Sequence, residues 1–96
     1  MGGIDMKILH LPLMAKWYEM IESGEKQEEY RENKPYWQKR LLSVKYDAVL
    51  FRYGYTTRTM TFRIKQIRFG IGKKEWGAGD NEVFIIELGE RIKKEE

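Results

Sequence analysis

Three charged residues of different chemistry stand close together between Gly24 and Arg31. Lys26, Glu29 and Arg31 lie in the spacing Gly-x-Lys-x-x-Glu-x-Arg. A lysine amine can donate hydrogen bonds or act as a base or nucleophile, and a carboxylate can orient a cation or activate water. An arginine fork can hold a phosphate or the edge of a base in two places. The stretch therefore predicts a site for a polar or anionic ligand, with catalysis as a second use of the same groups.

The arrangement of the three side chains depends on where a strand begins. In a regular strand Glu29 and Arg31 point to the same face, because side chains alternate. Lys26 has the opposite parity and joins them only if it lies in the turn before the strand. In the functional interpretation, Arg31 and Lys26 hold the ligand while Glu29 orients them. In the alternative, Glu29 and Arg31 form an ion pair that only supports the structure, and the sequence leaves both open.

An amphipathic helix is expected directly before this stretch. Pro12 suits the first turn of a helix, where no backbone N–H is needed. Large apolar residues then recur at helical spacing at Leu13, Trp17, Met20 and Ile21. Gly24 is placed to end the helix in the left-handed conformation. We expect the main helix from about Leu13 to Ser23.

The remaining pattern indicates strands and one short helix. Strands are expected at Met6–Leu11, buried on both sides, and at Lys26–Glu32, Tyr46–Tyr53, Thr59–Phe69 and Val83–Leu88. The short helix is expected at Pro35–Leu42, a hairpin loop at Gly54–Thr57, a glycine-rich loop at Gly70–Gly79 and a frayed charged tail at Gly89–Glu96. Apolar residues change parity near Lys65-Gln66, which predicts a bulge or bend there. The fold class is α+β and mainly β, a small mixed β-barrel of about five to six strands.

Length and composition limit the possible classes of protein. The 96 residues are 42% hydrophobic and suit a single domain, 1–96, with an ordered core at about 6–92. Without cysteine there are no disulfides or thiolate zinc sites, and one histidine argues against a histidine metal site. We expect no cofactor and no metal. No apolar run approaches the ~20 residues that span a bilayer, and the start does not resemble a signal peptide, so we expect a cytoplasmic protein without a membrane partner.

Basic residues are concentrated in the middle of the chain. The net charge is +3, and no acid occurs from Ala48 to Lys74. This span holds Arg52, Arg58, Arg63, Lys65, Arg68, Lys73 and Lys74. Such asymmetry predicts a positive face suited to a polyanion or a phosphorylated ligand. The alternative, that these residues are only solubilising groups on outward strand positions, is equally open.

Several aromatic residues neighbour basic ones, as stacking on unpaired bases requires. They are Tyr30, Tyr36, Trp37, Tyr53 and Tyr55, of which Trp37 and Tyr53 are assigned to the core. Tyr55, between two arginines in the hairpin loop, is the stronger stacking candidate, and Trp76 beside two lysines is similar. The predicted ligand-binding residues are Lys26, Glu29, Arg31, Tyr36, Arg40, Arg52, Tyr55 and Arg58.

The motif and the order of elements around it resemble a stand-alone ASCH domain of the PUA-like superfamily, as found in small bacterial or phage-type proteins. The motif reads Gly24-x-Lys26-x-x-Glu29-x-Arg31, and the resemblance extends from near Met6 to about Ile92. It implies a PUA-like β-barrel with a cleft beside the motif, and an RNA or nucleotide-like ligand. Binding in that basic cleft is the leading functional hypothesis.

The second functional hypothesis is an amidohydrolase acting on a modified nucleoside. Some small ASCH proteins remove the acetyl group of N4-acetylcytidine with the motif lysine, a threonine three residues later and a downstream glutamate. Lys26 matches the lysine, whereas Glu29 occupies the threonine position. Glu75 is the candidate for the downstream acid. The candidate catalytic residues are thus Lys26, Glu29 and Glu75, and the chain departs from the hydrolase pattern more than from the binding pattern.

Overall fold

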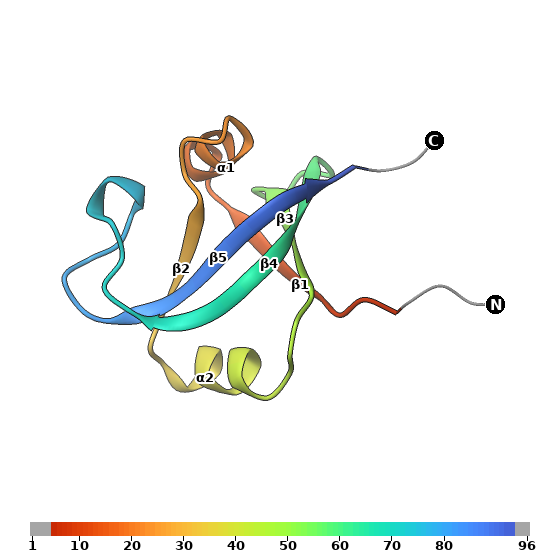
Figure 1. Cartoon of the computed structure of the whole chain (residues 1–96). Helices are drawn as coiled ribbons and strands as arrows, with labels where there is room; N and C mark the ends of the chain where they lie inside the picture. The colour runs from red at the N-terminus through yellow and green to blue at the C-terminus, as the bar shows by residue number, and fades with distance from the viewer. Residues whose placement is uncertain (1–4, 94–96) are drawn as a thin grey trace.

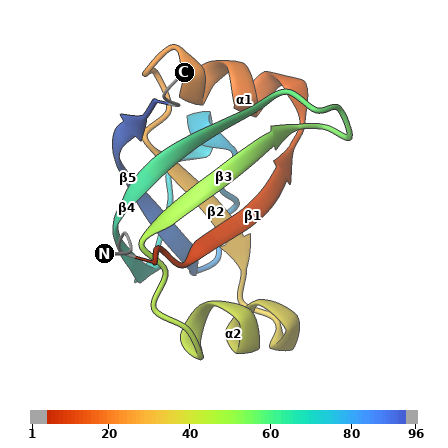
Figure 2. The ribbon, with the colours of Figure 1, turned by 90° about the vertical axis from the view of Figure 1, so that its right-hand side faces the viewer.

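A single five-stranded sheet organises the computed structural model, which describes residues 5–93. The elements are β1 (Ile8–Leu13), α1 (Ala15–Glu22), β2 (Glu28–Glu32), α2 (Pro35–Leu42), β3 (Ala48–Tyr53), β4 (Thr59–Gly70), the 3₁₀ turn η1 (Lys74–Trp76) and β5 (Val83–Ile92). The strand order is β1-β3-β4-β5-β2, with only β1 and β3 parallel. The sheet curls into a half-barrel, with α1 at one end and α2 at the other (Figures 1 and 2).

The concave face of the sheet holds the core. Alternate residues of β1, β3, β4 and β5 point inward, where they meet apolar side chains of both helices. The cluster contains Leu9, Leu11, Leu13, Tyr18, Ile21, Leu41, Val49, Phe51, Met60, Phe62, Phe84, Ile86 and Leu88. Trp37 packs against it from α2, as predicted. Among the described residues, no helix is long and apolar enough to cross a membrane.

The first strand differs from its prediction in two ways. It is buried on one face only, since its residues alternate between exposed and buried, and Ile8 is 37% exposed. It also continues through Pro12 and Leu13, which register with β3, so Pro12 does not begin a helix. The Lys7 and Leu13 carbonyls accept hydrogen bonds from the β3 side. The backbone groups of Pro12 point the other way, towards the open edge of the sheet. The missing N–H of Pro12 therefore removes no hydrogen bond between β1 and β3.

The first helix is shorter than predicted. It begins at Ala15, and its buried residues are Tyr18 and Ile21. Trp17 is half-buried rather than part of the core, because the helix is rotated so that Tyr18 faces β3. The Tyr18 ring packs edge-on against Tyr53, with centroids 5.1 Å apart. This rotation leaves Trp17 on the side of the helix that faces the charged motif.

The last two strands confirm one prediction and correct another. The pairing of β4 with β5 shifts register between Phe62 and Ile64 and again between Ile64 and Gln66, which confirms an irregularity close to Lys65-Gln66. The segment from Gly89 to Ile92 is not frayed, because the long strand β4 gives it a partner; Ile92 registers with Thr61. The final residues, 94–96, lie outside the described part of the chain.

The two free edges of the sheet face each other across the open side of the half-barrel. They belong to β1 and β2, which are not neighbours in the sheet. Side chains bridge this gap, which we call the β1–β2 seam: Arg31 Nη2 of β2 donates to the Pro12 carbonyl of β1 over 3.4 Å. From α2, Arg40 Nη2 donates to the His10 carbonyl of the same edge over 3.1 Å. The charged motif therefore lies where the barrel is left open.

Candidate ligand-binding site

The turn between α1 and β2 places Lys26 beside the strand residues of the motif. The helix ends at Glu22, and Gly24 follows with φ of 90°, the left-handed conformation predicted for it. The Lys26 N–H donates to the Met20 carbonyl over 2.9 Å, which turns the chain back along the helix end. Since β2 begins only at Glu28, Lys26 lies before the pleat and reaches the Glu29 face.

Lys26, Glu29 and Arg31 form one ionic cluster, which we call the triad; Lys26 and Glu29 are buried and Arg31 is partly buried. Lys26 Nζ lies 3.2 Å from Glu29 Oε1, and Arg31 Nη1 donates to Glu29 Oε2. Lys26 is 2% exposed and Glu29 is 5% exposed. Two cations thus share one carboxylate, which leaves the triad with a net charge of about +1.

Burial and the carboxylate act in opposite directions on Lys26. Desolvation lowers its pKa below the ordinary 10.5, and Glu29 opposes this by stabilising the ammonium form. The ammonium has three N–H donors. One points to the Trp76 carbonyl at 2.7 Å and one to Glu29. The third has no hydrogen-bond acceptor among the described residues.

The triad lines a pocket of about 280 Å³, which we call the triad pocket. It is bounded by Pro12, Leu13, Met14, Trp17, Lys26, Glu29, Tyr30, Arg31, Trp76 and Gly77. Aromatic rings surround the amine: Lys26 Nζ is 5.3 Å from the Trp17 ring centroid and 4.6 Å from that of Tyr30. The pocket therefore combines flat apolar walls with a charged floor, a combination typical of ligand sites.

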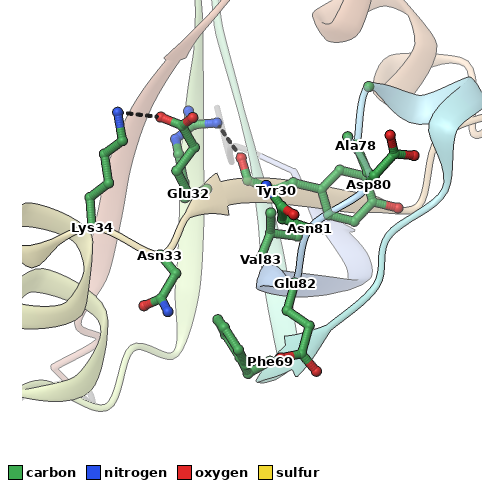
Figure 3. Close-up of a pocket in the computed structure, with 13 residues that line it drawn as sticks. Tyr30, Glu32, Asn33, Lys34, Phe69, Ala78, Asp80, Asn81, Glu82 and Val83 are labelled. Atoms are coloured by element: carbon green, nitrogen blue, oxygen red, sulfur yellow. Dashed lines mark hydrogen bonds and ion pairs between the residues drawn. The ribbon is translucent and has the colours of Figure 1, made fainter.

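A larger and more acidic depression adjoins the triad pocket. This outer cleft has a volume of about 700 Å³ and lies between the end of β2 and the loop before β5 (Figure 3). It shares Tyr30, Arg31 and Gly77 with the triad pocket. Lys26 and Glu29 do not line it, so we place the site in the smaller pocket, where all three triad residues meet.

Two further predicted residues are connected to the triad through Trp37. Arg31 lies over the Trp37 ring at 5.2 Å and Arg40 at 5.8 Å from its centroid. Arg40 Nη1 also donates to the Tyr36 hydroxyl over 2.9 Å. Tyr36 and Arg40 thus extend the site along the β1–β2 seam towards α2.

The other predicted residues lie elsewhere. Arg52, Tyr55 and Arg58 belong to the β3–β4 hairpin and do not line the triad pocket. There, Arg58 pairs with Glu22 at 2.8 Å. Glu75 is exposed in η1 and does not line the pocket either; its neighbour Trp76 does.

The acid-free span of the sequence is not an acid-free surface. Four of its seven basic residues pair with carboxylates from other segments. The pairs are Arg58–Glu22 at 2.8 Å, Arg63–Glu90 at 3.7 Å, Arg68 with Glu28 at 3.3 Å and with Glu87, and Lys74–Asp80 at 2.6 Å. The predicted positive face is therefore partly neutralised by these pairs.

Trp17 is the aromatic residue of the pocket that sequence reasoning missed. Its helical spacing assigned it to the apolar stripe of the helix, and that spacing fits the neighbouring stripe of Tyr18 and Ile21 equally well. In the structure Gly77 has φ of 102°, and a Cβ built on it would lie 3.0 Å from the Trp17 ring. Sequence alone does not reveal that these two residues approach each other.

The loop that carries Trp76 is fixed to β2 by Tyr30. The Tyr30 hydroxyl donates to Glu28 over 2.8 Å and accepts from the Lys73 N–H over 3.0 Å. Burial is the main reason that the pKa of this hydroxyl is raised well above its ordinary value. The Tyr30 ring packs so closely on Gly72 that a Cβ there would lie 2.6 Å from it.

We expect Gly72→Ala to destabilise the protein by about 1–3 kcal/mol, because the added methyl overpacks against Tyr30 and Ala78. The matched control is Gly79→Ala in the same loop, where a Cβ meets nothing within 4 Å. Urea unfolding of both variants measures the difference. Equal stability of the two variants would contradict the close packing of the loop on β2.

The described residues contain no group of three or more His, Asp or Glu side chains that could hold a metal ion. Comparisons with protein-family models, with curated proteins and with solved structures found no match for this chain. The triad pocket is therefore the feature of the molecule that bears on function.

Proposed function

We propose that the chain is an ASCH-like domain with a PUA-like fold, and that it binds RNA or a nucleotide-like ligand in the triad pocket. The observation that carries this proposal is the largely buried Lys26–Glu29–Arg31 triad on the floor of a pocket walled by Trp17 and Trp76. The curled mixed sheet and the position of the motif directly after α1 support the family assignment.

If the only role of the triad were structural, its burial would contribute little to the stability of the protein. Burying charges costs several kcal/mol per ion, and well-packed apolar residues often stabilise a protein as much as a buried ion pair does. The triad also has an uneven charge and free donors: one N–H of Lys26 and the Nε–H of Arg31 have no protein acceptor among the described residues. A ligand carbonyl oxygen supplies the acceptor, and a phosphate oxygen supplies both the acceptor and the missing negative charge.

The walls of the pocket define the rest of the ligand. Indole faces stack on planar aromatic groups, and every nucleobase has such a face. Donors from Lys26 and Arg31 and an acceptor from Glu29 match the mixed donor and acceptor edge of a base. A pocket of about 280 Å³ limits the buried portion to a small group such as one base.

Tryptophan fluorescence tests this proposal. Trp17 and Trp76 line the pocket and Trp37 does not, so the emission of the wild type is compared with that of Trp17→Phe/Trp76→Phe, which keeps only Trp37. We expect nucleosides, nucleoside monophosphates or short single-stranded RNAs to change the wild-type emission, with affinity for RNA falling as salt rises. Absence of binding at low salt, or binding that salt does not affect, would contradict an RNA ligand. A response in Trp17→Phe/Trp76→Phe as large as in the wild type would place the ligand elsewhere.

Hydrolysis of a modified nucleoside is the second candidate function. One observation favours it: burial lowers the pKa of Lys26, which increases the fraction of neutral amine beside the pocket. Glu75 does not line the pocket, so Glu29 is the carboxylate placed to activate water. Incubation with N4-acetylcytidine followed by chromatography tests this. Release of cytidine and acetate that is lost in Lys26→Ala would rank the enzyme above the binding domain.

A further inference from the structure

We propose that the site takes a single-stranded oligonucleotide rather than a free nucleotide, with a second base stacked on Tyr36 and its phosphate held by Arg40. This inference rests on the proposed function, because it places the first base in the triad pocket. It assigns the seam between β1 and α2 as the path of the chain that leaves the pocket.

Two surfaces lead away from the triad pocket, and they differ in charge. The outer cleft is lined by the exposed acids Glu32, Asp80 and Glu82, against Arg31 and Lys34. The opposite surface runs along the free edge of β1 to α2. Neither β1 nor α2 contains an aspartate or glutamate. A phosphodiester chain is repelled by the first surface and accepted by the second.

Along the second surface, two arginines follow the edge of β1 in order. Arg31 donates to the Pro12 carbonyl and Arg40 to the His10 carbonyl. These carbonyls are two residues apart, or about 7 Å along a strand. The fixed positions of the guanidinium groups suit successive phosphates of an extended strand, and each arginine keeps N–H donors free for this purpose.

Tyr36 supplies a stacking surface that is both exposed and held in place. It is 61% exposed, yet its ring packs edge-on against Trp37 with centroids 4.8 Å apart and an interplanar angle of 84°. Arg40 holds its hydroxyl at 2.9 Å. An immobilised aromatic face loses little conformational entropy when a base stacks on it.

Tyr55 shows by contrast what an unsupported exposed tyrosine looks like. It is 98% exposed at the tip of the β3–β4 hairpin. No aromatic or cation–π partner holds its ring among the described residues. Its hairpin lies at the end of the half-barrel opposite α2, the helix that carries Tyr36 (Figure 2). Tyr55 therefore provides a matched control for Tyr36.

The test compares ligand length by the tryptophan fluorescence of the wild-type chain, which keeps the Trp37 ring against Tyr36. The probes are the four nucleoside 5′-monophosphates and the RNA homotetranucleotides of A, C and U. We expect the best tetranucleotide to bind at least tenfold more tightly than the best monophosphate. We expect Tyr36→Ala to remove most of that advantage with a much smaller effect on the monophosphate, as base stacking is strong enough to account for such a difference. Tyr55→Ala should change neither affinity.

Arg40 provides an independent arm of the same experiment. Arg40→Gln removes the charge and should reduce the dependence of tetranucleotide affinity on salt, since one phosphate contact is lost. Monophosphate binding with no gain in the tetranucleotide, or equal losses for both ligands in Tyr36→Ala, would overturn this inference and leave the proposed function intact. Absence of binding by every probe would overturn the proposed function itself.

Discussion

Replacing Glu29 by glutamine is expected to lower the free energy of unfolding by about 3–5 kcal/mol. The carboxylate is 5% exposed and lies between Lys26 and Arg31. Glutamine has nearly the same shape but no charge, so the buried Lys26 ammonium and the partly buried Arg31 guanidinium remain side by side without an anion. Urea unfolding monitored by circular dichroism measures the loss, and a change below about 1 kcal/mol would show that water already screens the triad.

Lys26→Met is the matched control for this substitution. Methionine is similar in size to lysine but carries no charge. The substitution therefore removes one buried charge and leaves Glu29 and Arg31 as a pair with no net charge. The loss of the hydrogen bond to the Trp76 carbonyl is offset by the removal of the desolvation cost of the ammonium. We therefore expect a change of less than about 1.5 kcal/mol in either direction. A loss as large as that of Glu29→Gln would show that the triad has no excess positive charge.

The difference in stability between Lys26→Met and the wild type should depend on pH, because the pKa of Lys26 is shifted in the folded state. Burial lowers the pKa of Lys26 in the folded state below 10.5. Between the two pKa values the unfolded chain holds a proton that the folded chain has released, so stability rises with pH across this interval. Below this pH interval, Lys26 is protonated in both states, and the folded protein is destabilised by the full desolvation cost of the buried ammonium. The stability of Lys26→Met minus that of the wild type should therefore decrease as pH rises towards 10.5, and an increase would contradict the shift.

Much of the fold was predictable because its signals are local. Gly24 ends the helix in the left-handed conformation, and Pro35 begins α2 at the expected place. The parity change in β4 corresponds to the register shifts with β5. The errors concern neighbours that are distant in sequence. Pro12 reads as a helix start until β1 is known to be an edge strand, and Gly89–Ile92 reads as a frayed tail until β4 is seen to provide a partner.

The same distinction explains the candidate site. Lys26, Glu29 and Arg31 lie within six residues, so strand parity and one turn were enough to bring them together. The contribution of Trp17 and Trp76 depends on how α1 and the glycine-rich loop pack around β2, which no local pattern records. The predicted hairpin residue Arg58 illustrates the same limit of local patterns. Arg58 is neutralised by Glu22, a residue 36 positions away that lies beside it only in the folded chain.

Arg31→Lys is expected to lower ligand affinity at least tenfold, or about 1.4 kcal/mol, although the charge is kept. The guanidinium contacts four groups at once: the Glu29 carboxylate, the Tyr30 carbonyl at 2.9 Å, the Pro12 carbonyl at 3.4 Å and the Trp37 ring. A lysine ammonium has three donors on a flexible stem and cannot reproduce this planar arrangement. The substitution therefore weakens the hydrogen bond across the β1–β2 seam. It also displaces the N–H donors that we propose for the ligand.

The stability of the same variant separates binding from structure. The ammonium that replaces the guanidinium still neutralises Glu29, so we expect a loss of only about 1–2 kcal/mol from the hydrogen bonds across the seam. Arg58→Lys, in an exposed ion pair of the hairpin, is the control and should leave ligand affinity unchanged. Urea unfolding and fluorescence titration with the best-binding nucleoside monophosphate are measured on both variants. If Arg31→Lys loses about 3–5 kcal/mol of stability but keeps its affinity, Arg31 closes the half-barrel and does not contact the ligand.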